Sequence, residues 1–170
     1  MKLIIRVTLL IIAVIITQIA LAQKSLKPGT TTIILLRHAE KDTINGQDPP
    51  LSAMGKKRAK RLAKQFPKVS PNAFYSTNFI RTKETVTPWS KLAGKQIKIY
   101  DAAKQPEFAS MLTKQKGKTI VVVGHSNTIP QLVNLIIGKD KYSPLPDAEY
   151  SKIFIVTIKN GKAEDKLITY

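Results

Sequence analysis

Residues 31–41 read TTIILLRHAEK, and this stretch indicates both the fold and the place of the chemistry. Its first six residues are β-branched or apolar and follow a Pro-Gly pair, which predicts a buried strand over residues 31–36. Arg37, His38 and Glu40 come directly after that strand. The chain contains only two histidines, so a strand end that places one of them beside an arginine is a candidate functional site.

The second histidine has a similar setting. Residues 120–130 read IVVVGHSNTIP, so His125 also follows a strand, predicted over residues 118–124. In an open α/β sheet the carboxyl ends of the parallel strands border the ligand crevice. If the two strands are neighbours, His38 and His125 face one pocket.

The rest of the chain alternates between strand and helix signals. A loop is predicted over residues 41–50, and Ser52 can cap a helix over 53–66. The further predicted elements are a strand at 72–76, a helix at 78–94 broken or kinked by Pro88, a strand at 95–100, a helix at 106–117, a helix at 127–138, a loop at 142–149 and a hairpin at 150–170 with an Asn-Gly turn. This alternation predicts a three-layer α/β/α fold with a mostly parallel central sheet and an antiparallel edge.

The first 22 residues have the layout of a secretory signal peptide. Lys2 and Arg6 precede an apolar run over residues 7–16, and Ala20 and Ala22 form an A-x-A pattern. We expect cleavage after Ala22, which leaves residues 23–170 as a single domain in an extracytoplasmic (periplasmic or secreted) location. An uncleaved membrane anchor is the alternative, although the run is short for a span of about 20 residues.

Charge and composition narrow the function classes. Without Lys2 and Arg6 the chain keeps 26 basic and 11 acidic side chains, a net charge of +15 that attracts anions. The basic residues are spread along the chain with no aromatic residues between them, which favours a solvated surface over a specific nucleic-acid site. Electrostatic contact with an anionic membrane surface stays open. The absence of cysteine excludes thiolate catalysis and cysteine-ligated zinc.

The residues beside the histidines suit phosphoryl transfer. Arg37 has the planar fork that binds phosphate through two parallel hydrogen bonds, and Arg81 lies on the first turns of a helix whose N-terminus also favours anions. A neutral imidazole is a competent nucleophile, and adjacent guanidinium groups disfavour its protonated form. No metal or other cofactor is required where arginines and a second histidine hold the phosphoryl group.

LLRHAEK and VVVGHSNTIP together resemble the histidine phosphatase superfamily, the phosphoglycerate-mutase-like fold, and its small phosphohistidine-phosphatase branch in particular. DPPLSAMGKKRA is similar to that family's Leu-Ser/Thr-x-x-Gly segment, and FYSTNFIRTKETVTPW is similar to its Ser-x-x-x-Arg segment less strictly. The usual motif is Arg-His-Gly, and Ala39 stands here in place of the glycine. The resemblance implies a metal-independent phosphatase acting on a phosphorylated small molecule or phosphoprotein.

Carried onto this sequence, the resemblance makes His38 the phosphorylated nucleophile and places Arg37, Arg81 and His125 around the phosphate. Glu40 is expected to orient the site beside the substrate, and Asn127 is either a pocket edge or a helix cap. The general acid is the weakest assignment. Asp101, just past a strand end, is the preferred candidate over Glu107, and the compact region around it also fits family members that work without a dedicated acid.

Two other classes of function stay open. An extracytoplasmic module that binds phosphate groups with little or no turnover would use the same pocket. A metal site built from the histidines with Glu40 or Asp101 fits the flanking arginines poorly, because they would repel a cation. The sequence does not name the substrate or the oligomeric state.

Overall fold

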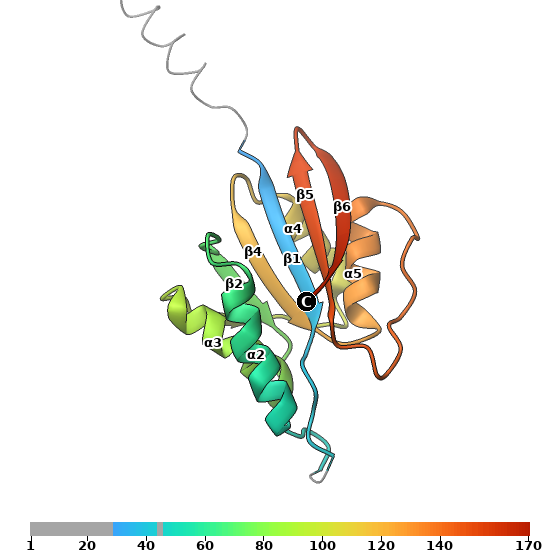
Figure 1. Cartoon of the computed structure of the whole chain (residues 1–170). Helices are drawn as coiled ribbons and strands as arrows, with labels where there is room; N and C mark the ends of the chain where they lie inside the picture. The colour runs from blue at the N-terminus through green and yellow to red at the C-terminus, as the bar shows by residue number, and fades with distance from the viewer. Residues whose placement is uncertain (1–28, 44–45) are drawn as a thin grey trace, which may run out of the picture.

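The computed structural model describes residues 29–43 and 46–170, so the predicted signal peptide lies outside the described residues. A single six-stranded sheet forms the centre, in the order β3-β2-β4-β1-β5-β6 (Figure 1). Its elements along the chain are β1 (Thr31–Arg37), α2 (Ala53–Gln65), β2 (Ala73–Ser76), α3 (Ile80–Leu92), β3 (Ile97–Ile99), α4 (Gln105–Thr113), β4 (Thr119–Gly124), α5 (Thr128–Ile137), β5 (Lys152–Lys159) and β6 (Lys162–Thr169).

The predicted fold class is confirmed. Strands β1 to β4 pair in parallel, and β5 and β6 add an antiparallel edge beside β1. The hairpin between β5 and β6 turns at Asn160 and Gly161, which have φ of 52° and 77°. A two-residue hairpin turn of this kind needs positive φ at both central positions, and Asn-Gly tolerates it best.

Strand β1 is apolar from Ile33 to Leu36 because helices cover both faces of the sheet. Ile33 and Leu35 pack in the cluster that contains residues of α4 and α5, while Ile34 and Leu36 pack in the cluster that contains residues of α2 and α3. Successive side chains of a strand point to opposite faces, so a strand buried on both sides needs a continuous apolar run. These two cores hold β1 and β4 in the middle of the sheet.

Pro88 does not break helix α3, which corrects one of the two effects predicted for it from the sequence. The helix runs through it to Leu92, and the chain leaves the helix at Gly94, whose φ is 62°. Only one backbone donor is lost at Pro88, and the buried Val86 and Trp89 on either side anchor the helix to the core. Helix α4 also ends earlier than predicted, at Thr113.

Helix α2 begins against the backbone of Glu40, and this contact explains the glycine in its first turn. Ser52 donates its backbone N–H to the Glu40 carbonyl at 2.9 Å, and its hydroxyl accepts from the Gly55 N–H at 3.1 Å. A Cβ atom on Gly55 would lie 2.2 Å from the Glu40 oxygen. The side chain of Ala39 is fully buried here in a small cluster with Leu51 and Ala59. The start of α2 is therefore tied to the segment that carries His38.

Within the described residues no helix is long and apolar enough to cross a membrane.

Candidate active site

Three neighbouring strands end at one edge of the sheet, and a polar side chain follows each of them. Strand β4 pairs in parallel with β1 on one side and with β2 on the other, with Arg37 opposite Gly124. The His38 N–H donates to the Gly124 carbonyl at 2.9 Å, which continues the ladder by one residue. The structure thus brings together Thr77 after β2, His38 after β1 and His125 after β4, and the ring centroids of the two histidines are 5.5 Å apart.

His38 is buried and held in one tautomer. Its Nδ1 lies 2.7 Å from the carbonyl oxygen of Ala39, which can only accept, so Nδ1 carries the proton and Nε2 keeps a free lone pair. Burial lowers its pKa to about 4, and the charges of Arg37, Arg81 and His125 act in the same direction, against the opposing effect of the Ala39 hydrogen bond. At neutral pH the ring is therefore uncharged and nucleophilic at Nε2.

His125 is positioned by two threonines. Its Nε2 shares a hydrogen bond of 3.0 Å with the Thr77 hydroxyl, and its backbone N–H donates to the Thr128 hydroxyl at 3.1 Å. Its pKa is lowered to about 4, chiefly by burial; the charges of Arg81 and Arg37 act in the same direction, and Asp48 opposes them. Both imidazoles are thus neutral in the site at pH 7.

Arg37 is anchored through one end of its guanidinium group. Its Nη1 donates to the carbonyl oxygens of Pro146, Asp147 and Glu149 at 2.8 to 3.1 Å. The Tyr150 ring lies against the guanidinium, with 4.2 Å between the ring centroid and Cζ. The Nε atom is buried and has no hydrogen-bond partner. The protein therefore fixes the Nη1 end of the guanidinium group, while the buried Nε donor has no hydrogen-bond partner.

Arg81 repeats this arrangement from the opposite direction. It lies in the first turn of α3, and its Nη1 donates to Asp48 at 3.2 Å. Its guanidinium rests on the Phe79 ring at 4.4 Å. The backbone carbonyl of Arg81 accepts from the Thr85 hydroxyl, which in turn accepts from the Ala39 N–H, so α3 is bonded to the segment after His38.

Two buried donors without partners point to an anion. Nε of Arg81, like Nε of Arg37, is buried and unpaired. Buried unsatisfied donors are costly, and they are expected only where a ligand or water completes them. Arg37 and Arg81 both lower the pKa of His38, and an oxyanion with several acceptor atoms, such as a phosphoryl group, would satisfy their unpaired donors.

The other residues predicted for the site lie outside this group. The Glu40 carboxylate forms a bidentate pair with Arg58, with a closest distance of 2.6 Å, and so helps to fix α2 to the segment after His38. Asn127 stands at the N-cap position of α5, is exposed and makes no side-chain capping bond. Asp101 is exposed and accepts from the Ala103 N–H at 2.9 Å, on the rim of a neighbouring cavity.

Sequence reasoning missed three residues that contact the site. Phe79 packs edge-on against His125, with 4.9 Å between ring centroids. Asp48 accepts from both the Ile80 N–H and Arg81. Tyr150 covers Arg37 and lies 6.1 Å from the His38 ring. Asp48 lies in a predicted loop and Tyr150 at the start of the predicted hairpin, and no local pattern distinguishes either of them from surface residues.

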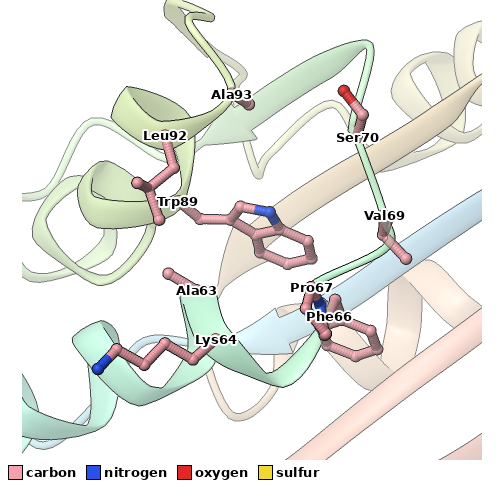
Figure 2. A pocket seen from close by; sticks show the side chains of 9 residues that line it. All are labelled: Ala63, Lys64, Phe66, Pro67, Val69, Ser70, Trp89, Leu92 and Ala93. Atoms are coloured by element: carbon pink, nitrogen blue, oxygen red, sulfur yellow. The ribbon is translucent and has the colours of Figure 1, made fainter.

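Two further observations concern rival sites. In the described part of the chain, no three histidine, aspartate or glutamate side chains lie close enough together to hold a metal ion. A cavity of about 440 Å³ opens between the last turns of α2 and α3, beside the stacked rings of Phe66 and Trp89 (Figure 2). None of the predicted site residues lines it.

Comparison with known proteins agrees with this geometry. The model of the histidine phosphatase superfamily (branch 1) matches residues 33–109, which include His38 and both arginines. Over these residues the chain resembles the histidine phosphatase superfamily. No curated protein sequence matches it. His125 lies beyond the matched range, and the tertiary structure brings it to the same site.

Solved structures share the fold at low sequence identity. The protein histidine phosphatase SixA complexed with tungstate has 18% identity and a TM-score of 0.66, over 81% of this chain and 96% of that chain. A phosphoserine phosphatase from Entamoeba histolytica in complex with 3-phosphoglyceric acid has 16% identity and a TM-score of 0.65, over 82% and 98%. A mycobacterial glucosyl-3-phosphoglycerate phosphatase has 14% identity and a TM-score of 0.62, over 83% and 98%. The family match thus supports a phosphatase, and the likenesses to solved structures show the phosphoglycerate-mutase-like fold.

Proposed function

We propose that the protein is a phosphatase that hydrolyses phosphate monoesters or phosphoramidates through a phosphohistidine intermediate on His38. One observation carries the proposal: the free Nε2 of a neutral His38 adjoins two arginines whose buried Nε donors have no partner. A nucleophile and the donors for a phosphoryl group are then in place together, as an in-line transfer requires.

In the first step, the lone pair of His38 Nε2 attacks phosphorus, and the bond from phosphorus to the leaving oxygen or nitrogen breaks. The electron pair departs with the leaving group, which takes up a proton. Arg37 and Arg81 hold the phosphoryl oxygens and the charge that develops on them. Throughout, Nδ1 of His38 keeps its proton in the bond to the Ala39 carbonyl, which stabilises the ring as it becomes positively charged.

In the second step, a water oxygen attacks phosphorus, the bond to Nε2 breaks and inorganic phosphate leaves. His125 contributes a neutral imidazole whose ring centroid is 5.5 Å from that of His38 and whose N–H can donate to a phosphoryl oxygen. The reaction as written uses no metal ion.

Asp101 remains the candidate for the acid that protonates the leaving group. It lies on the rim of the cavity that Thr77 and Phe79 share, on the His125 side of the site. Replacement Asp101→Asn is expected to slow alkyl phosphates more than p-nitrophenyl phosphate, because a nitrophenolate leaves without protonation. Equal slowing of both substrates would remove Asp101 from this role.

The test of the proposed function is hydrolysis of p-nitrophenyl phosphate by the purified chain in the presence of a chelator, beside His38→Ala and the matched surface variant Lys57→Ala. A denaturing quench should trap phosphate on the protein that is labile in acid and stable in base, and His38→Ala should lose both turnover and trapped phosphate. A stable phosphate complex without turnover would instead support a phosphate-binding module. Activity restored only by added metal ions would support the metal alternative.

We further propose that the phosphatase acts outside the cytoplasm as a single domain over residues 23–170. The proposal rests on the signal-peptide pattern of residues 1–22 and on the high positive charge of the remainder. Its substrate would be a phosphorylated small molecule or phosphoprotein, and the likeness to SixA favours the small phosphohistidine-phosphatase branch. Mass measurement of the exported protein tests cleavage after Ala22.

A further inference from the structure

A cavity of about 460 Å³ lies beside the phosphate pocket, at the ends of β2 and β3. Residues 77–79, which follow β2, form one side, and residues 99–102, at the end of β3, form the other. Strand β3 is the edge of the sheet, so no further strand covers this side. Of the residues that line it, the proposed mechanism gives a chemical role only to Asp101, on the rim.

The cavity and the phosphate pocket share a wall. Thr77 lines the cavity and also bonds to Nε2 of His125 at 3.0 Å. Phe79 also lines the cavity. The same ring contacts His125 and Arg81 on the side of the phosphate pocket. Through Thr77 and Phe79, the cavity therefore adjoins the pocket that would hold the phosphoryl group.

The exposed part of the lining combines two large apolar side chains, Phe79 and Ile99, with the polar Asn78 and Asp101. Phe79 is 38% exposed and Ile99 is 51% exposed, which is unusual for two large apolar side chains on one small surface. The floor is rigid, because the buried Tyr100 ring stacks on Phe108 with 4.2 Å between centroids. The hydroxyl of Tyr100 also fills the space where a Cβ on Gly124 would lie. Asp101 supplies the one charged group, and it would disfavour an anionic ligand.

We propose that this cavity is a specificity subsite that accepts an uncharged or cationic ring on the group attached to phosphorus. An apolar cavity of about 150 Å³ is enough for a benzene ring, so the space is ample. The ring would pack against Phe79 and Ile99 and remove both from water. The inference rests on the proposed function, since it names the substrate class of the same site: phosphate esters or phosphoramidates of aromatic or other ring-bearing groups.

The test uses phosphonates, which bind without being hydrolysed. Calorimetric titration of the full chain with benzylphosphonate and with methylphosphonate compares the same anion with and without a ring. We expect benzylphosphonate to bind at least about tenfold more tightly, in line with the burial of one ring face. Ile99→Ser should reduce the affinity for benzylphosphonate about three- to fivefold and leave that for methylphosphonate unchanged. Ala102→Phe, which fills the cavity, should abolish the preference.

Leu167→Ser is the matched control, because Leu167 is 39% exposed on β6, at the opposite edge of the sheet. It should change neither affinity. Equal binding of the two phosphonates would overturn the subsite, as would a ring preference that survives both Ile99→Ser and Ala102→Phe. Failure of both ligands to bind would remove the phosphate pocket and the subsite with it. If benzylphosphonate binds more tightly but the protein has no phosphatase turnover, only the proposed function is refuted. If the protein turns over substrate but binds the two phosphonates equally, only the subsite is refuted.

Discussion

Acid should destabilise the protein through His38, and replacement by asparagine should remove that effect. The pKa of His38 is lowered from 6.5 to about 4, chiefly by burial. Below pH 6.5 the unfolded chain binds a proton at this ring, whereas the folded chain does not until pH 4. Stability from His38 is therefore complete above pH 6.5 and is lost as the pH falls toward 4.

The size of the effect follows from the same two values. Each pH unit between them is worth about 1.4 kcal/mol, so His38 costs about 2 kcal/mol of unfolding free energy at pH 5 and about 3 kcal/mol at pH 4. His38→Asn keeps an amide donor near the position of Nδ1 for the Ala39 carbonyl and does not titrate. Its unfolding free energy should thus fall about 2 kcal/mol less than that of the wild type between pH 7.5 and pH 5.

Urea unfolding followed by circular dichroism at the two pH values measures this difference. Ion pairs such as Glu40 with Arg58 are present in both proteins, so their pH dependence cancels. Asn127→Ala, a neighbouring change without a titrating group, should show the wild-type drop. If His38→Asn loses as much stability as the wild type, burial does not lower the pKa of His38, and its neutral form is not protected at acid pH.

Three other substitutions test how the site is built. Gly55→Ala should lower the unfolding free energy by about 1–3 kcal/mol, because the new Cβ would lie 2.2 Å from the backbone oxygen of Glu40. Thermal melts measure this loss, and the exposed Lys57→Ala should leave the melting temperature unchanged. An unchanged melting temperature for Gly55→Ala would refute the close contact. Arg37→Lys keeps the positive charge but loses the planar guanidinium group, so kcat/KM for p-nitrophenyl phosphate should fall about 100-fold or more. A loss below about threefold would contradict a role for both hydrogen-bonding edges of the guanidinium group. Tyr150→Phe should retain kcat/KM within about twofold, because the ring stays against Arg37. Tyr150→Leu removes this cation–π contact and should lower kcat/KM about three- to tenfold. Equal losses in the two variants would show that the hydroxyl, and not the ring, supports activity.

Much of the fold could be read from local patterns. The apolar run before Arg37 and the one before His125 predicted two buried strands, and both form the centre of the sheet. Such runs are informative because only a strand covered on both faces needs apolar residues at every position. The predicted break at Pro88 does not occur, because the core packing of its neighbours outweighs a local helix breaker.

The site divides in the same way. Two histidines at strand ends and two arginines beside them were visible in the sequence, because strand ends and helix starts are local features. Strand β4 lies next to β1, and this places the ring centroids of the two histidines 5.5 Å apart. Local sequence patterns do not determine this strand order. Tyr150 and the carbonyls that anchor Arg37 lie more than 100 residues further along the chain. The sequence by itself determined which reactive side chains this protein can use. Only the tertiary structure decided which groups surround those side chains, because the positions of long loops depend on packing across the whole domain.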